Sequence, residues 1–211
     1  MELLGNSCPS QKSFESNHPG PKRWRSNGAK FFSDESLESG FDVLVHCAGI
    51  TYQRLFTETS TDEYRKLIDV NLSGTFFCLK HAVTRMKSNN IQGSIVVISS
   101  ISAHRPLPSQ AVYSCTKAAM ESLVQSIAVE AAPLHIRANC SVPGAGRTHL
   151  IREPRRKTDN VANKPSGNGI PYGRVGEPED MVGTTLFLAS GLSAYMTGAS
   201  LVVDDGLGLR R

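Results

Sequence analysis

The segment Gly93–Ser100 constrains the fold of this chain more than any other stretch. It reads Gly-Ser-Ile-Val-Val-Ile-Ser-Ser, a short β-branched run without polar alternation. Such a run is typical of a strand that is buried on both faces of a parallel sheet. Between Ala118 and Ala131, apolar residues recur at helical spacing, and Pro133 ends this pattern. A buried strand followed by such a helix favours an α/β fold.

The same alternation continues along the chain from residue 42. Strands are predicted at 42–46, 93–99, 136–142 and 199–204, and helices at 61–87, 111–132 and 178–190. An irregular loop is predicted at 144–172. This order predicts a parallel sheet flanked by helices, with right-handed crossover connections.

Tyr113 and Lys117 lie four residues apart at the start of the predicted helix 111–132. This spacing puts the phenol and the ammonium on one helix face, one turn apart. A positive charge there favours the phenolate, so we expect Tyr113 to exchange protons at a lower pH than its usual pKa of about 10. The alternative is an exposed tyrosine beside a solvated lysine.

Ser100 lies thirteen residues before Tyr113, at the end of the predicted strand 93–99. Ligands of open α/β sheets bind outside the carboxyl ends of the strands. A serine at this position can therefore meet a residue on the first turn of the next helix. Alternatively, Ser99 and Ser100 could simply cap a turn or a helix.

Six ordered motifs between residues 41 and 208 resemble the classical short-chain dehydrogenase/reductase family. They are the strand ending in Ala48-Gly49, the Asn71 segment 69–74, Ser100 with Tyr113 and Lys117, Val142-Pro143-Gly144 with Thr148, 173–180 and 197–204. The resemblance implies a Rossmann-like sheet and an NAD(P)-dependent oxidoreductase that interconverts a carbonyl and a secondary alcohol. Its substrate would be a small molecule.

The resemblance also implies a role for each matching residue. Ser100 would bind the substrate oxygen, and Tyr113 would be the acid/base. Lys117 would lower the pKa of the tyrosine and bind nicotinamide-ribose hydroxyls, and Asn71 would hold a water for proton relay. The cofactor, NADP or NAD, would contact Ala48, Gly49, Asn71, Tyr113, Lys117, Pro143, Gly144, Gly146 and Thr148. The loop 144–172 would be the substrate loop.

Asn71 is also noticeable without the resemblance, because it falls in a helical apolar stripe of the predicted helix 61–87. A buried amide must be hydrogen-bonded or it costs about 1 to 3 kcal/mol. The simpler interpretation is a core asparagine that bonds a neighbouring carbonyl.

Three sites depart from the family pattern. His46-Cys47 replaces asparagines beside the cofactor, Gly146 stands where Ile or Val is usual, and Asp205 replaces a glycine. We interpret His46-Cys47 as a packing pair at a strand end, not as a ligand set.

Residues 1–40 lack the glycine-rich turn with which the family binds the cofactor pyrophosphate. They are rich in Ser, Pro and Asn and have no apolar periodicity, which predicts an irregular, disordered segment. We therefore expect an N-terminally truncated domain over 41–211, with strand 42–46 as an exposed edge. Alternatively, residues 1–40 build a replacement phosphate site.

A second function is compatible with the same motifs. A catalytically impaired chain could act as an interaction or regulatory subunit of a full-length homologue, through the helices 61–87 and 111–132. These helices resemble those that pair subunits in the family, so we also expect a homo-oligomer.

The composition limits the classes of partner that we expect this chain to bind. The 211 residues carry a net charge of +4, but the basic residues are scattered over predicted loops, which argues against a nucleic-acid partner. No run of eighteen apolar residues occurs, so no membrane association is expected. The five cysteines have no CxxC pairing or metal-ligand spacing. They predict a reducing, cytoplasmic setting and no metal site.

Overall fold

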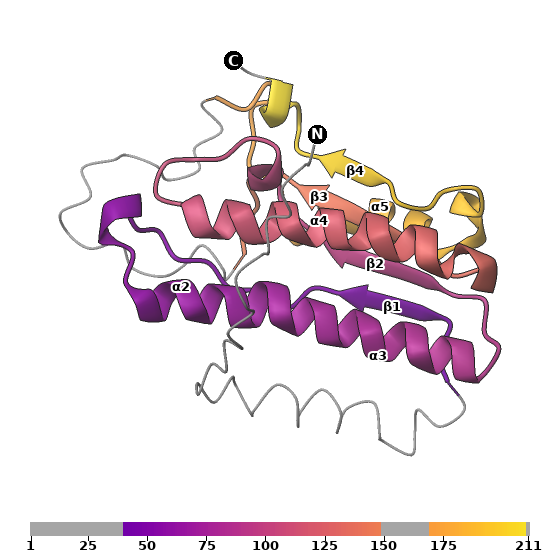
Figure 1. The fold of residues 1–211 in the computed structure, drawn as a ribbon. Coiled ribbons are helices and arrows are strands. Elements are labelled where there is room, and N and C mark those ends of the chain that lie inside the picture. The colour runs from indigo at the N-terminus through magenta and orange to yellow at the C-terminus, as the bar shows by residue number, and fades with distance from the viewer. Residues whose placement is uncertain (1–39, 149–168, 210–211) are drawn as a thin grey trace, which may run out of the picture.

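The computed structural model describes residues 40–148 and 169–209 of the chain. The predictions for residues 1–39 and for 149–168 of the substrate loop lie outside these ranges. The described part contains a four-stranded parallel sheet in the order β1-β2-β3-β4 (Figure 1). Its strands are β1 (Val43–His46), β2 (Ser94–Ile98), β3 (Arg137–Pro143) and β4 (Ser200–Val203).

Helices follow the strands as predicted. They are α2 (Thr61–Leu67), α3 (Gly74–Ser88), α4 (Ala111–Ala131) and α5 (Val182–Ala189), with a π-helical segment, Ile68–Ser73, between α2 and α3. The Rossmann-like α/β prediction is confirmed. The predicted helix 61–87 is therefore continuous from α2 to α3 and widens locally at the π-helical segment. A 3-10 turn, Pro178–Met181, precedes α5.

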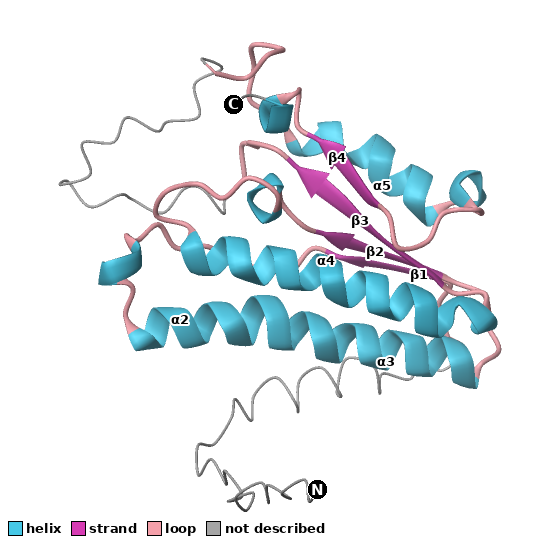
Figure 2. Ribbon diagram, turned by 45° about the horizontal axis from the view of Figure 1, so that its top comes forward, coloured by secondary structure: helices cyan, strands magenta, loops and turns pink. Residues whose placement is uncertain are grey.

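The helices lie in two layers around the sheet. Figures 1 and 2 show α3 and α4 side by side on one face and α5 on the other. The main core lies between the sheet and α3/α4 and contains Leu79, Ala82, Met86, Ile95, Val97, Met120, Val124, Ala128, Ala131, Ile136, Ala138, Cys140 and Val142. None of the helices in the described ranges is long and apolar enough to cross a membrane.

Local sequence signals set the helix boundaries. Ser60 begins α2 with a capping box, in which its hydroxyl accepts from the Glu63 N–H and the Glu63 carboxylate accepts from the Ser60 N–H. At the other end, Pro133 follows α4, and His135 has a left-handed φ of 55° that turns the chain into β3.

The parallel register brings the functional segments to one edge of the sheet. His46 pairs with Val97, Ile98 with Ser141, and Pro143 with Val203. The carboxyl ends of all four strands therefore meet at the same edge, and the segments that follow them lie close together there.

Candidate active site

Tyr113 and Ser100 meet at this edge. Tyr113 lies on the first turn of α4 and is only 8% exposed. Burial raises the pKa of Tyr113, and a hydrogen bond with the Ser100 side chain acts in the opposite direction. The Ser100 hydroxyl also accepts from the Ser102 N–H at 3.2 Å and caps the 3-10 turn Ile101–Ala103. Both interpretations of Ser100, as a turn cap and as a neighbour of Tyr113, therefore hold.

Lys117 lies one turn further along α4 and is 5% exposed. Its Nζ donates to the Ile98 carbonyl at 2.8 Å and lies 5.8 Å from the centroid of the Tyr113 ring. Burial lowers the pKa of Lys117 to about 8, although nearby Cys140, Cys47 and Glu121 oppose this.

The expected effect of Lys117 on Tyr113 is not what the structure gives. We expected the ammonium to lower the pKa of the phenol, but the pKa of Tyr113 is raised. The physical reason is that the phenol is buried, while the Lys117 Nζ is directed at the Ile98 carbonyl at the end of β2. Desolvation disfavours the charged phenolate.

Asn71 occupies the π-helical segment and is fully buried. Its Oδ1 accepts from the Ile50 N–H at 2.8 Å, and its Nδ2 donates to the Ile50 carbonyl at 2.9 Å and to the Thr116 hydroxyl at 3.1 Å. Asn71 thus links the segment after β1, at Ile50, to α4, at Thr116, by hydrogen bonds. The helix is locally widened at this segment, and the role of Asn71 in a water relay stays a prediction.

Gly49 connects the end of β1 to this cluster. A Cβ atom built on Gly49 would lie 3.5 Å from the Asn71 Oδ1 and 3.7 Å from the Lys117 Nζ. The preceding residue, Ala48, is exposed at the same edge. The sequence-predicted residues that the structure brings together are therefore Gly49, Asn71, Ser100, Tyr113 and Lys117.

The predicted residues after β3 are held by other partners. Pro143 ends β3, and the Gly144 N–H donates to the Val203 carbonyl at 2.9 Å. A Cβ on Gly144 would lie 2.6 Å from the Asp204 Cβ, so only glycine fits there. Gly146 pairs with Gly176 as an isolated bridge. The exposed Thr148 donates its N–H to the Gly146 carbonyl at 3.1 Å.

This edge fits one half of a nicotinamide dinucleotide. The buried Lys117 Nζ and the small Gly49 border the cluster, and the exposed residue Thr148 follows the carboxyl end of β3. No glycine-rich turn for the pyrophosphate follows a strand within 40–148 and 169–209. The nicotinamide half therefore has candidate ligands here, whereas the phosphate half has none among the described residues.

His46 and Cys47, the two departures beside the cofactor, differ in their surroundings. The His46 Nε2 lies 2.9 Å from the Thr75 hydroxyl, and burial, together with the charge of Lys117, lowers the pKa of His46 to about 4. His46 is thus a neutral packing residue, as interpreted from the sequence. Cys47 is exposed, so the packing interpretation does not extend to it.

Sequence reasoning missed Glu121, which lies on α4 four residues after Lys117 and is buried. Its carboxylate accepts from Ser99 at 2.6 Å and from Ser200 at 2.7 Å, and lies 2.8 Å from the His104 Nε2. The helical spacing from Lys117 was the available signal, because it put a carboxylate on the same helix face.

Comparisons with known proteins agree on one family. The family model described as enoyl-(acyl carrier protein) reductase matches residues 31–208. The L-rhamnose 1-dehydrogenase (NAD(P)(+)) of Azotobacter vinelandii is 40% identical over 166 residues, which are 79% of this chain and 64% of that protein. The chain thus spans less than two thirds of the length of this curated relative.

Solved structures have the same fold. A short-chain dehydrogenase/reductase family protein matches with a TM-score of 0.76 at 31% identity, over 88% of this chain and 74% of that chain. The gluconate 5-dehydrogenase of Burkholderia cenocepacia, in complex with NADP and tartrate, matches with a TM-score of 0.78 at 28% identity, over 89% of this chain and 71% of that chain. Fold, motif order and family model agree, and the chain belongs to the short-chain dehydrogenase/reductase family.

Proposed function

We propose that this chain is an NAD(P)-dependent oxidoreductase that interconverts a small carbonyl compound and a secondary alcohol, with Tyr113 as the acid/base. The observation that carries the proposal is the convergence of Ser100, Tyr113 and Lys117 at the carboxyl ends of the strands. Relatives of this chain are named as dehydrogenases, and one of them is named for NAD(P)(+). The free thiols of Cys47, Cys78, Cys115 and Cys140 support a reducing, cytoplasmic setting.

In the proposed reaction the chain's own residues handle the proton. The raised pKa keeps Tyr113 protonated at neutral pH, so the phenol is ready to donate to a carbonyl oxygen. Ser100 would hydrogen-bond the same oxygen and hold it beside the phenol. A bound NADH or NADPH would supply the hydride.

The nicotinamide half of that cofactor would be held at the same edge. Lys117 would bind the ribose hydroxyls, and Asn71 would keep the segment containing Ala48 and Gly49 in place. Backbone groups of Pro143, Gly144 and Gly146, with the Thr148 hydroxyl, would anchor the carboxamide. We propose this set without a preference between NAD and NADP.

Isotope transfer tests the proposed reaction directly. The chain is incubated with NADH or NADPH that carries deuterium at the transferable position of the nicotinamide, together with a panel of sugar, oxoacyl and steroid ketones. Mass spectrometry then detects deuterium on the carbinol carbon of the product. Labelled alcohol from at least one ketone is expected. Absence of label across the panel, at millimolar cofactor, would contradict the proposal.

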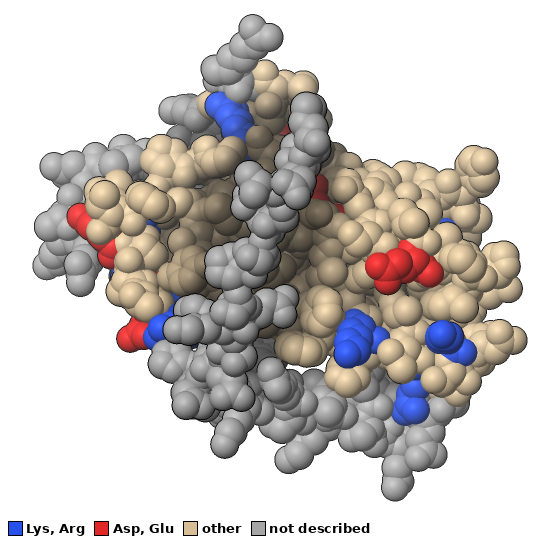
Figure 3. Space-filling view, in the orientation of Figure 1, with Lys and Arg blue, Asp and Glu red and all other residues tan. Residues whose placement is uncertain are grey.

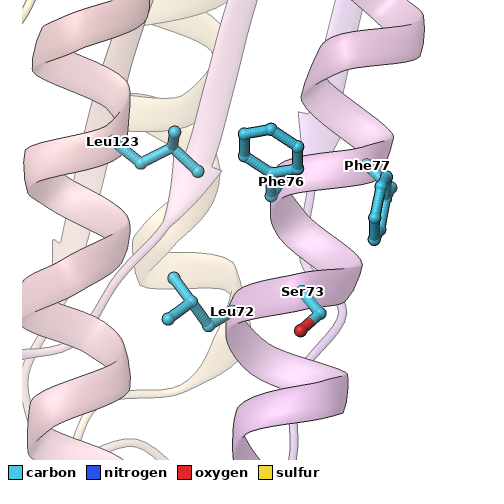
Figure 4. A pocket seen from close by; sticks show the side chains of 5 residues that line it. All are labelled: Leu72, Ser73, Phe76, Phe77 and Leu123. Carbon is cyan, nitrogen blue, oxygen red and sulfur yellow. The ribbon is translucent and has the colours of Figure 1, made fainter. Parts of the chain in front are cut away.

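We also propose that a second copy of this chain, or a full-length homologue, pairs through α3 and α4. A groove of about 370 Å³ between these helices is lined by Leu72, Ser73, Phe76, Phe77 and Leu123. Figure 4 shows Leu72 and Phe76 pointing toward the helix that carries Leu123. Phe76 is 45% exposed. Figure 3 shows scattered Lys, Arg, Asp and Glu side chains on the described part of this face, which is otherwise tan.

Sedimentation of Phe76→Glu tests the pairing. A charge in this groove is expected to shift the protein to a smaller species, because desolvating a carboxylate against apolar side chains is costly. Leu192→Glu, at an exposed site in the turn after α5, is the matched control and is expected to sediment like the wild type. An unchanged oligomeric state in Phe76→Glu would contradict pairing through this face. Retained pairing without isotope transfer would favour the interaction-subunit role.

A further inference from the structure

Glu121 is a buried carboxylate with three partners from three different segments. It is 8% exposed and sits one turn beyond Lys117 on α4. The hydroxyls of Ser99 and Ser200 donate to it at 2.6 Å and 2.7 Å, and the His104 Nε2 lies 2.8 Å from it. A carboxylate is retained in such a place only when hydrogen bonds compensate its lost hydration.

Two of these partners flank Ser100. Ser99 directly precedes it, and His104 directly follows the 3-10 turn Ile101–Ala103 that Ser100 begins. The Ser99 hydroxyl also lies 3.5 Å from the Lys117 carbonyl. Glu121 therefore ties the chain on both sides of Ser100 to the helix that carries Tyr113 and Lys117. Its third partner, Ser200, adds the first residue of β4 to the same anchor.

Glu121 also lies close enough to Lys117 for its negative charge to raise the pKa of the Lys117 ammonium. The titratable groups that face Lys117 are His46 and Cys47 at the end of β1, Cys140 on β3, and Tyr113 and Glu121 on α4.

Most of these neighbours are neutral where Lys117 titrates, at a pKa of about 8. Burial raises the pKa of Cys140 to about 12 and also raises that of Cys47, so both are thiols at that pH. The pKa of His46 is about 4, so its imidazole is uncharged. Within the described part of the chain, this leaves Glu121 as the negative charge that acts on the ammonium.

We propose that Glu121 is a positioning residue of this site: its carboxylate holds the turn that carries Ser100 against α4 and supplies the negative charge that acts on the Lys117 ammonium. Its effect on turnover rests on the proposed function, whereas its effect on Lys117 does not.

Three variants test the two roles of Glu121. Glu121→Gln keeps the size of the side chain but removes its charge and replaces one acceptor oxygen with an amide donor, and Glu121→Leu removes the charge and all of its hydrogen bonds. Glu130→Gln, at an exposed position of the same helix, is the matched control. Lysine labelled with ¹³C at the ε-carbon reports the titration of Lys117 by NMR, and Lys117→Met assigns the signal. Steady-state kinetics at saturating ketone, with the concentration of NADH or NADPH varied, give kcat and the KM of the cofactor.

The pH midpoint of Lys117 is expected to fall by about half a pH unit or more in Glu121→Gln, because an opposite charge favours the ammonium. It is expected to stay unchanged in Glu130→Gln. In Glu121→Gln, kcat is expected to fall about tenfold with a smaller change in KM, because Ser100 loses its alignment with Tyr113. Glu121→Leu is expected to lose more.

Two outcomes would overturn the inference. A Lys117 midpoint in Glu121→Gln equal to that of the wild type would refute the electrostatic link, whether or not the protein turns over. A shifted midpoint with unchanged kcat would refute the positioning role. A shifted midpoint in a chain without any turnover would support the link to Lys117 and count against the proposed function instead.

Discussion

The candidate site has two sides, one formed by β2 and α4 and the other by β1, and the described residues build the first more completely than the second. On the side of β2 and α4, Ser100, Tyr113 and Lys117 are buried or bonded to one another and to strand ends. On the side of β1, Val43 and Val45 are 38% and 40% exposed. The strand β1 is hydrogen-bonded to β2 alone among the described strands.

The described residues therefore build the acid/base part of the proposed site but not a binding site for the cofactor phosphates. The acid/base cluster depends on helix α4, the end of β2 and the Asn71 segment, all of which are present. The pyrophosphate of a dinucleotide would need a turn beside β1 that the described residues do not contain. Catalytic geometry and cofactor affinity should therefore respond differently to mutation.

The largest expected effect is that of Tyr113→Phe on turnover. Removal of the hydroxyl should lower kcat about a hundred- to ten-thousandfold, the usual contribution of general acid catalysis. The fold should survive because only one oxygen is lost. The assay follows NADPH oxidation with a ketone substrate, and circular dichroism checks the fold.

Tyr195→Phe, at a fully exposed tyrosine, serves as the control and is expected to retain wild-type turnover. If Tyr113→Phe kept more than half of the wild-type activity, the acid/base role would belong to another residue.

The second effect concerns stability on the two sides of the sheet. Leu79→Ala, in the closed core, should lower the free energy of unfolding by about 2 to 5 kcal/mol, because it leaves a cavity. Val45→Ala, on the open edge, should cost less than about 1 kcal/mol, because the valine is already partly hydrated. Urea unfolding measures both. If both substitutions lowered the free energy of unfolding equally, β1 would be as well buried as the core, and the two sides of the site would not differ.

A smaller effect should appear in the pH dependence of stability. The pKa of Lys117 is about 8 in the folded chain and 10.5 in the unfolded chain, so the unfolded chain binds more protons between these values. The free energy of unfolding should therefore rise as the pH increases from about 8 to about 10.5. At about 1.4 kcal/mol per pH unit, the rise is about 3 kcal/mol.

Lys117→Met should lack this component of the rise and should be more stable than the wild type below pH 8, where the buried charge is costly. Chemical unfolding at a series of pH values compares the two proteins. A parallel pH dependence in both would show that the Lys117 ammonium is not destabilised by burial.

Much of the fold could be predicted because its signals are local. The β-branched run of β2 and the helical spacing of α4 lie within single elements, and the Tyr113–Lys117 pair needs only one helix turn. The close approach of Ser100 to Tyr113 followed from the rule that parallel strands end at one edge. These features require no knowledge of distant contacts.

The remaining features depend on contacts between distant parts of the chain. Glu121 is bonded to Ser99 and Ser200, which come from different strands. The raised pKa of Tyr113 reflects burial, which spacing along a helix does not reveal. Asp205, which replaces a glycine of the family pattern, has a left-handed φ of 52°, and its carbonyl accepts from the distant Tyr172 N–H.

Calorimetric comparison of reduced nicotinamide mononucleotide with NADPH and NADH tests the contrast between the two halves most directly. We expect the dinucleotides to bind within about tenfold of the mononucleotide and no tighter than about 10 μM. The reason is that hydrogen bonds to charged groups are worth about 1.5 to 3 kcal/mol each, and residues 40–148 and 169–209 contain no phosphate turn that would supply several of them. A dinucleotide that binds more tightly than 10 μM, and more than about a hundredfold better than the mononucleotide, would contradict this contrast and show that residues outside 40–148 and 169–209 build a phosphate site.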